Sequence, residues 1–119
     1  MIAVENERLE LVRRLLACAM PLQSTLSALG AMDWDYDGLP VQLTAEQIAA
    51  VLRRYLAGRL SRTDIETWAN GVEGRDDIAT DPAVEHQLTG IMHELANPAL
   101  SQPLDHARAT ALLTELAAS

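Results

Sequence analysis

Apolar residues recur every three or four positions along most of the chain, which is the spacing of one face of an α-helix. The first such stretch runs from Glu5 to about Met20, because Pro21 cannot continue the helical hydrogen bonding. The segment PLQSTLSALG, residues 21–30, then predicts a short second helix that Gly30 closes. No stretch alternates apolar and polar residues as a half-buried strand would, so the pattern predicts an all-α protein.

Start and stop signals define the helices that follow. Thr44 and Gln47 match a capping box, in which the threonine hydroxyl accepts from the third amide and the glutamine side chain reaches back. Gly58 can end this helix, since glycine adopts a left-handed cap at little cost. A third long helix is predicted to start after Ser61 and to end near Gly74.

Two more helices complete the chain. Asp81, followed directly by proline, predicts an N-cap with proline at the first helical position, and Asn97 with its following proline stops that helix. Asp105 is predicted to cap the last helix. Residues 31–43 and 74–80 are expected to be loops. The fold class is therefore an all-α compact bundle of about five helices joined by short loops, in a single domain over residues 1–119.

The helical stripes also predict which side chains form the core. Gly71 lies inside one predicted helix, where glycine costs about 1 kcal/mol relative to alanine. The large side chains expected to be buried are Leu15, Leu16, Val51, Leu52, Leu56, Ile65, Trp68, Leu88, Ile91, Leu95, Leu112 and Leu116.

The formal net charge of −8 narrows the classes of partner. A nucleic-acid binder would present a basic face to the phosphates, and an anionic membrane would repel this chain, so neither partner is expected. No apolar run approaches the roughly 20 residues that cross a bilayer, and the N-terminus lacks the order of a signal peptide. We therefore expect a cytoplasmic protein. Cys18 is the only cysteine, which excludes an internal disulfide, and its helical stripe predicts a small buried hydrophobe.

The segment DWDYDG, residues 33–38, matches the start of a calcium-binding loop. Asp33, Asp35 and Asp37 with Gly38 occupy the first, third, fifth and sixth positions of that pattern. The twelfth position requires a bidentate glutamate, and here it is Thr44. Because the twelfth position lacks a glutamate, the simpler interpretation is that the aspartates bond to nearby amides of the loop. A calcium-responsive module built on this loop remains the alternative.

No cofactor, metal or catalytic site is predicted. His86 and His93 fall on the solvent side of one predicted helix, and seven residues separate them by roughly 10 Å along the axis, too far to chelate one ion directly. His106 is expected in the first turn of the last helix. No nucleophile elbow or phosphate-binding glycine loop occurs, so we expect a protein that is not an enzyme.

Acidic residues are concentrated in the middle of the chain and could form a docking face. Seven acids lie from Asp64 to Glu85, against Arg75 inside this stretch and Arg62 just before it. Acids in polar loops are usually solvated, which is the simpler interpretation of this cluster. As a docking face, it would combine with exposed aromatic anchors. The expected partner-binding residues are Asp33, Trp34, Asp35, Tyr36, Asp37, Asp76 and Asp77.

Four blocks carry a resemblance over residues 33–116: DWDYDG, VLRRYLAGRLS, DIETWAN followed by VEGRDDI, and HELANPAL. In this order they resemble small bacterial all-helical proteins without an assigned function. YLAGRLS, residues 55–61, followed by an acid-bearing helix, is more distantly similar to colicin-type tRNase immunity proteins and to immunity proteins of contact-dependent growth inhibition. The resemblance implies a binding protein without chemistry of its own that covers the active site of a basic toxin.

We therefore expect a small acidic, non-catalytic protein that binds a basic protein partner, plausibly as an immunity protein or antitoxin. Besides the calcium-responsive module, two alternatives remain: an enzyme whose site is assembled from separate helices, and a structural subunit that oligomerises through an amphipathic helix. The sequence does not determine the oligomeric state.

Overall fold

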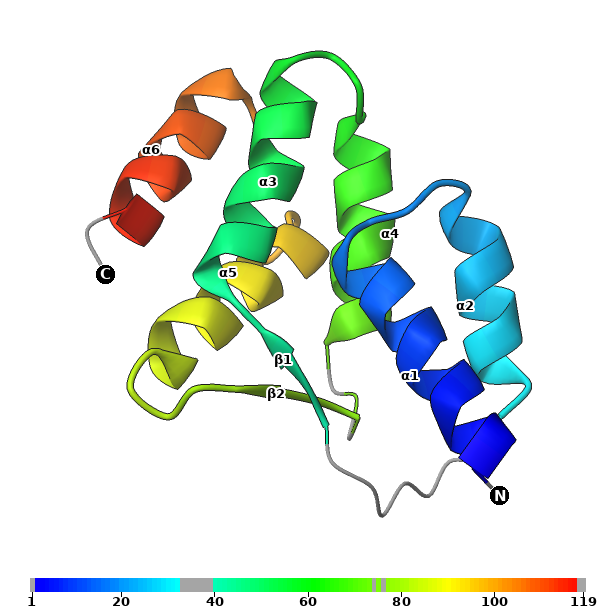
Figure 1. Cartoon of the computed structure of the whole chain (residues 1–119). Coiled ribbons are helices and arrows are strands. Elements are labelled where there is room, and N and C mark those ends of the chain that lie inside the picture. The colour runs from blue at the N-terminus through cyan, green and yellow to red at the C-terminus, as the bar shows by residue number, and fades with distance from the viewer. Residues whose placement is uncertain (1, 33–39, 74, 76, 118–119) are drawn as a thin grey trace.

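The computed structural model describes residues 2–32, 40–73, 75 and 77–117, which form a compact, mostly helical protein as predicted (Figure 1). The described residues form six helices and two short strands, close to the expected number of helices. None of these helices is long and apolar enough to cross a membrane. In chain order the elements are α1 (Ile2–Leu16), α2 (Leu22–Gly30), β1 (Val41–Leu43), α3 (Ala45–Leu56), α4 (Arg62–Val72), β2 (Ile78–Thr80), α5 (Glu85–Ala96) and α6 (His106–Ala117).

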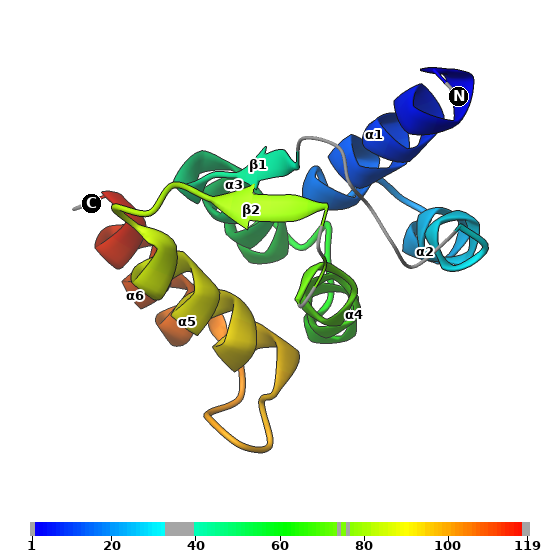
Figure 2. The ribbon, with the colours of Figure 1, turned by 90° about the horizontal axis from the view of Figure 1, so that it is seen from below.

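Helix α4 is the central element of the bundle. It contacts α5, α1, α2 and α3, while α1 pairs with α2 and α3 pairs with α6 (Figure 1). The α1–α2 pair therefore lies on one side of α4, and α3, α5 and α6 lie on the other (Figures 1 and 2).

The predicted capping signals are confirmed where they depend on neighbouring residues alone. The Thr44 hydroxyl accepts from the Gln47 amide at 3.2 Å, and the Gln47 side chain accepts from the Thr44 amide at 2.9 Å. Ser61 and Asp64 form a second capping box at the start of α4. Asp105 accepts from an amide in the first turn of α6, as expected.

Three predicted helix boundaries are wrong. Helix α1 ends at Leu16 rather than Met20, because Cys18 adopts the left-handed conformation (φ 53°) and its amide bonds back to a carbonyl of the last turn. Helix α4 ends two residues before Gly74. Asp81 caps a turn, accepting from the amide two residues on at 2.9 Å, and α5 begins only at Glu85. An Asp-Pro pair initiates turns as well as helices, and here the turn redirects the chain from β2 into α5.

The expectation of loops at residues 31–43 and 74–80 is wrong for the ends of both segments. Val41–Leu43 and Ile78–Thr80 pair as a two-stranded parallel sheet, with Val41 opposite Ile78 and Leu43 opposite Thr80. Each strand has only three residues, too few to show an alternating pattern. Their partners are also more than 30 positions apart, so no local turn signal marks the pairing.

The predicted core is confirmed at every position except Leu56. That side chain is half-buried and packs against the edge of the core, whereas the other predicted residues are buried. Trp68 is fully buried, and its indole N–H donates to the Leu15 carbonyl at 2.6 Å, which joins α4 to the end of α1. The loops contribute Leu60 and Leu104, which are also buried.

Gly71 allows α2 to approach α4 closely. A Cβ atom at this position would lie 2.5 Å from a terminal methyl group of Leu26, a distance that requires the leucine to move. On α5, by contrast, a Cβ at Gly90 would meet nothing within 4 Å. The helix-weakening glycine of α4 is therefore explained by packing.

Alanine at these two glycines is expected to shift stability in opposite directions. Gly90→Ala gains helix propensity without a clash and should stabilise the protein by up to about 1 kcal/mol. Gly71→Ala gains the same propensity but overpacks the α2–α4 contact, and it should destabilise by about 1 kcal/mol net. Urea unfolding of both variants measures the difference. Equal stabilisation by both would show that the α2–α4 packing does not require glycine.

Candidate functional site

The structure describes only one of the residues expected to bind a partner. Asp33, Trp34, Asp35, Tyr36, Asp37 and Asp76 lie outside the described residues, and so does the candidate calcium loop to Gly38. Asp77 is described, and it is 1 % exposed. The expectation of a solvated loop acid is therefore wrong for Asp77.

Asp77 is buried because two arginines bind its carboxylate. Arg75 donates through Nε to Oδ1 at 2.8 Å and through a terminal nitrogen to Oδ2 at 2.9 Å, and Arg8 of α1 lies 3.2 Å from Oδ2. Burial by itself raises the pKa of Asp77, but the hydrogen bond from Arg75 and the charges of Arg75 and Arg8 outweigh it, so the pKa lies below its ordinary value of 3.8. This ion cluster joins α1 to the sheet, since the Asp77 carbonyl also accepts from Val41 at 2.9 Å. It is a structural element, and its carboxylate is already occupied.

Next to this cluster, β2 forms one wall of a groove with a volume of about 280 Å³. We call it the β2 groove. Its apolar lining comes from four elements, so only the folded chain assembles it. These apolar residues are Leu43 of β1, Val72 of α4, Ile78 of β2 and Met92 of α5.

The polar lining of the β2 groove is acidic where it meets solvent. Glu73, directly after α4, and Glu85, at the start of α5, are both exposed. Arg75 also lines the groove, but Asp77 holds its guanidinium. The groove therefore combines an apolar surface with two exposed carboxylates, a combination that suits an amphipathic basic ligand.

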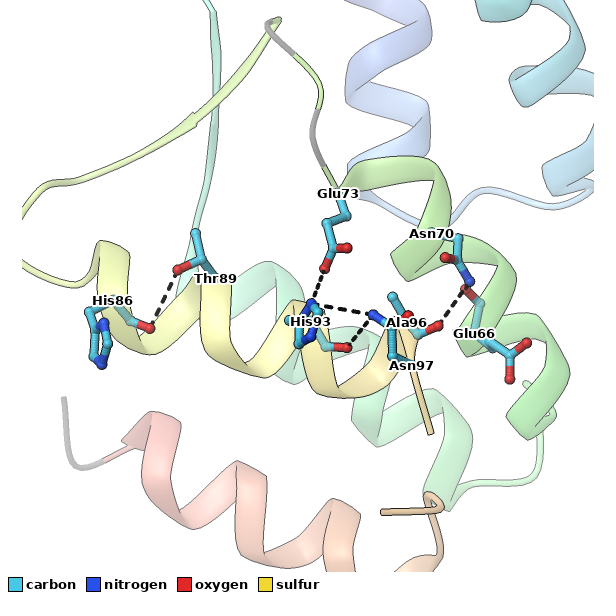
Figure 3. A network of polar contacts seen from close by, with 8 residues as sticks. All are labelled: Glu66, Asn70, Glu73, His86, Thr89, His93, Ala96 and Asn97. Atoms are coloured by element: carbon cyan, nitrogen blue, oxygen red, sulfur yellow. Dashed lines mark hydrogen bonds and ion pairs between the residues drawn. The ribbon is translucent and has the colours of Figure 1, made fainter. Parts of the chain in front are cut away.

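Polar contacts of α5 support one of these carboxylates (Figure 3). Glu73 Oε2 lies 3.3 Å from Nδ1 of His93, and the Asn97 amide donates to the His93 carbonyl at 2.9 Å. Asn70 of α4 donates to the carbonyl of Ala96 at 3.1 Å, which links the end of α5 to α4. The Glu73 carboxylate is thus held by His93, on a helix that Asn70 fixes to α4.

The histidines lie as expected. His86 and His93 are both exposed on α5 and lie well apart along the helix (Figure 3). His106 is in the first turn of α6, and its ring meets the Tyr55 ring edge-on at a centroid distance of 5.3 Å. Within the described part of the chain, no three histidine, cysteine or acidic side chains are grouped to hold a metal ion.

Cys18 is a buried small hydrophobe, as predicted, although it follows α1 rather than lying in it. Burial raises the pKa of its thiol to about 11; the nearby charge of Arg54 lowers it, and that of Asp64 raises it. The thiol is therefore protonated at neutral pH and is a poor nucleophile.

A second pocket, of about 290 Å³, lies between α4, the end of α5 and the segment leading to α6. Two glutamates line it. Glu94 is bound by Arg108 of α6 through two contacts of 2.7 Å, which leaves Glu66 as the exposed acid. Arg62 and Thr63 also line this pocket, so its charge is mixed and it favours no single class of ligand.

Four arginines are held by contacts within the protein. Arg8 and Arg75 bind Asp77, Arg108 binds Glu94, and Arg54 donates to the Ala17 and Cys18 carbonyls at the end of α1. Exposed arginines remain at the end of α1 and around the α3–α4 turn, which lies at the opposite end of α4 from β2 (Figure 1).

Comparison of the chain with known protein families, with curated proteins and with solved structures finds no match. The site is therefore defined by its geometry. Sequence reasoning had counted Glu73 and Glu85 in the acidic stretch without distinguishing them from its other members. The sequence signal that could have distinguished these two glutamates is their place at helix ends: Glu73 directly follows α4, and Glu85 lies in the first turn of α5.

Proposed function

We propose that this protein is a small acidic, non-catalytic binding protein of the cytoplasm that neutralises a basic protein toxin, as an immunity protein or antitoxin does. The observation that carries the proposal is the β2 groove, where an apolar lining lies beside the exposed carboxylates of Glu73 and Glu85. A surface of this kind favours a protein partner with basic and apolar side chains, and it disfavours nucleic acid. The net charge of −8 adds a long-range attraction for such a partner.

The proposal predicts a complex whose affinity depends on salt and on the groove. The probe for calorimetry is the purified product of the gene adjacent to that of this chain, in a catalytically inactive form, and the proposal expects this product to carry a basic toxin domain. Because charges contribute to the association, raising the salt from 50 to 300 mM should weaken binding by about tenfold or more. Glu73→Gln with Glu85→Gln should also weaken it by roughly 30-fold, since each of the two lost charge contacts at a partly buried interface is worth on the order of 1 kcal/mol.

A matched pair of neutralised glutamates serves as the control. Glu7 and Glu10 are exposed on α1, which does not line the groove, so Glu7→Gln with Glu10→Gln removes the same charge elsewhere. This control should bind within about threefold of the wild type. Expression of the chain should also restore growth to cells that make the active toxin. Absence of both binding and growth rescue would refute the proposed function.

A further inference from the structure

The outer edge of β2 has main-chain groups that the sheet does not use. The Val41 amide donates to the Asp77 carbonyl at 2.9 Å, and Val41 lies opposite Ile78 in a parallel register. In such a ladder alternate residues of a strand bond to the partner, so Ala79 bonds toward β1 while Ile78 and Thr80 direct their main-chain groups the other way. The Ile78 amide donates to the Arg75 carbonyl at 3.5 Å, so the groups that a further strand can use are the Ile78 carbonyl and the amide and carbonyl of Thr80. A two-stranded sheet thus leaves an edge on β2 to which a further strand can pair.

This edge faces the β2 groove. Ile78, Ala79 and Thr80 all line the groove, together with Leu43 of β1, residues of α5 and the end of α4. Figure 2 shows β1 on one side of β2, and α4 and α5 on the other. A third strand in the groove would therefore pair with β2 and place alternate side chains against Val72 and Met92, which also line it.

Charge indicates what kind of strand fits. Glu73 follows α4, which packs against α5, and Glu85 begins α5 just after the turn that leaves β2, so an exposed carboxylate lies toward each end of the groove. Among the described residues that line the groove, Arg75 is the only basic one, and Asp77 holds its side chain. An incoming strand with lysine or arginine would meet opposite charge, whereas an acidic strand would be repelled.

We propose that the β2 edge binds an extended basic segment of the partner protein as a third strand, lying in the β2 groove. This inference rests on the proposed function for the identity of the partner. Main-chain hydrogen bonds to the Ile78 carbonyl and to the amide and carbonyl of Thr80 provide affinity, and the apolar lining with its two glutamates provides the preference for alternating apolar and basic side chains.

Proline substitutions distinguish the two edges of the sheet. Thr80→Pro removes an outward amide of β2 and places a ring where the third strand would lie, while the ladder to β1 keeps its bonds. Gln42 is the corresponding outward residue of β1, so Gln42→Pro is the matched control on the opposite edge. Thermal melts establish that both variants fold.

The probe is an acetylated and amidated hexapeptide of alternating valine and lysine, measured by fluorescence anisotropy. Loss of the hydrogen bonds at Thr80 should weaken binding by about tenfold or more in Thr80→Pro, whereas Gln42→Pro should bind within about twofold of the wild type. A peptide with glutamate in place of lysine should not bind. Equal binding by the two proline variants, or by the two peptides, would overturn the proposal.

A change in the peptide tests the edge without changing the protein. N-methylation of every second peptide amide prevents strand pairing but keeps the side chains, and two such peptides can be made, one for each set of alternate amides. Only the peptide whose methylated amides face β2 should lose binding. Equal affinity of both methylated peptides and the parent would contradict edge pairing even if Thr80→Pro did not fold. If light scattering showed a dimer that Thr80→Pro converts to a monomer, a second copy of the chain would occupy the edge, and the proposal would be overturned.

Binding measurements with the toxin domain distinguish a failure of this inference from a failure of the proposed function. Toxin binding that Thr80→Pro leaves unchanged would remove the edge inference and keep the function. Peptide binding at the edge without toxin binding or growth rescue would keep the edge inference and remove the proposed function.

Discussion

Replacing Asp77 by alanine is expected to lower the free energy of unfolding by about 3–5 kcal/mol, because removing one partner of a buried ion cluster leaves the other charges without compensation. The side chain of Asp77 is 2 % exposed and that of Arg8 is 9 % exposed, so water cannot replace the lost contact at low cost. Urea unfolding followed by circular dichroism measures the change. Glu85→Gln removes an exposed carboxylate from the same region and should change stability by less than about 0.5 kcal/mol.

The pH dependence of stability provides a second measure of this cluster. Because the pKa of Asp77 is lower in the folded protein than in the unfolded chain, its contribution is fully present above the unfolded value of about 3.9. The contribution is lost as the pH falls below that value and through the lower folded pKa. Melts from pH 6 to pH 2 should show a steeper loss of stability below about pH 4 in the wild type than in Asp77→Asn. Parallel curves would contradict the assigned role.

The buried Arg8–Asp77 pair of the cluster can also be replaced, which leaves Arg75, 23 % exposed, to turn toward solvent. Well-packed apolar side chains often substitute for a buried ion pair without loss of stability. Arg8→Met with Asp77→Leu should therefore recover part of the stability that Asp77→Ala loses. No recovery in the double variant would indicate that the geometry of the hydrogen bonds, rather than uncompensated charge, determines the loss.

Replacing Trp68 by alanine should also cost about 3–5 kcal/mol, since it leaves a cavity where α4 meets the end of α1. Trp68→Phe keeps much of the ring but removes the indole hydrogen bond, and because the Leu15 carbonyl still accepts from the Cys18 amide, the loss should cost about 0.5–1.5 kcal/mol. A domain of this size has a total stability on the order of 5–15 kcal/mol, so the alanine variant would keep only a small margin. Urea unfolding followed by circular dichroism gives both values.

An exposed apolar residue is the control for Trp68. Leu100 is 79 % exposed, so Leu100→Ala should change stability by no more than about 0.5 kcal/mol. If Trp68→Phe were as stable as the wild type, the indole hydrogen bond would have no net value, and the cost of Trp68→Ala would come from packing alone.

Features that depend on neighbouring residues could be predicted from the sequence. The capping box of Thr44 and Gln47 joins residues only three positions apart. The stripe that contains Ile65 and Trp68 reflects the 3.6-residue period of α4. These local signals were sufficient to predict the all-α class and nearly all of the core.

The candidate site required contacts between distant parts of the chain. Asp77 and Arg8 are 69 positions apart, and no local pattern indicated that this loop acid is buried and paired. The β2 groove likewise requires β2 to pair with β1 and α5 to fold back beside it. Sequence reasoning recognised the acids as a group, but it had no means of separating the paired Asp77 from the exposed Glu73.

The sequence by itself determined where most helices form and which of their faces are apolar, because propensity, capping and periodicity act over a few residues. Only the tertiary structure decided that Gly71 lies against Leu26, that two three-residue segments pair as a sheet, and that the edge of β2 faces an acidic groove. These features arise when distant segments bury surface together and satisfy one another's polar groups, and the energy of such contacts belongs to pairs of residues that no short stretch of sequence contains.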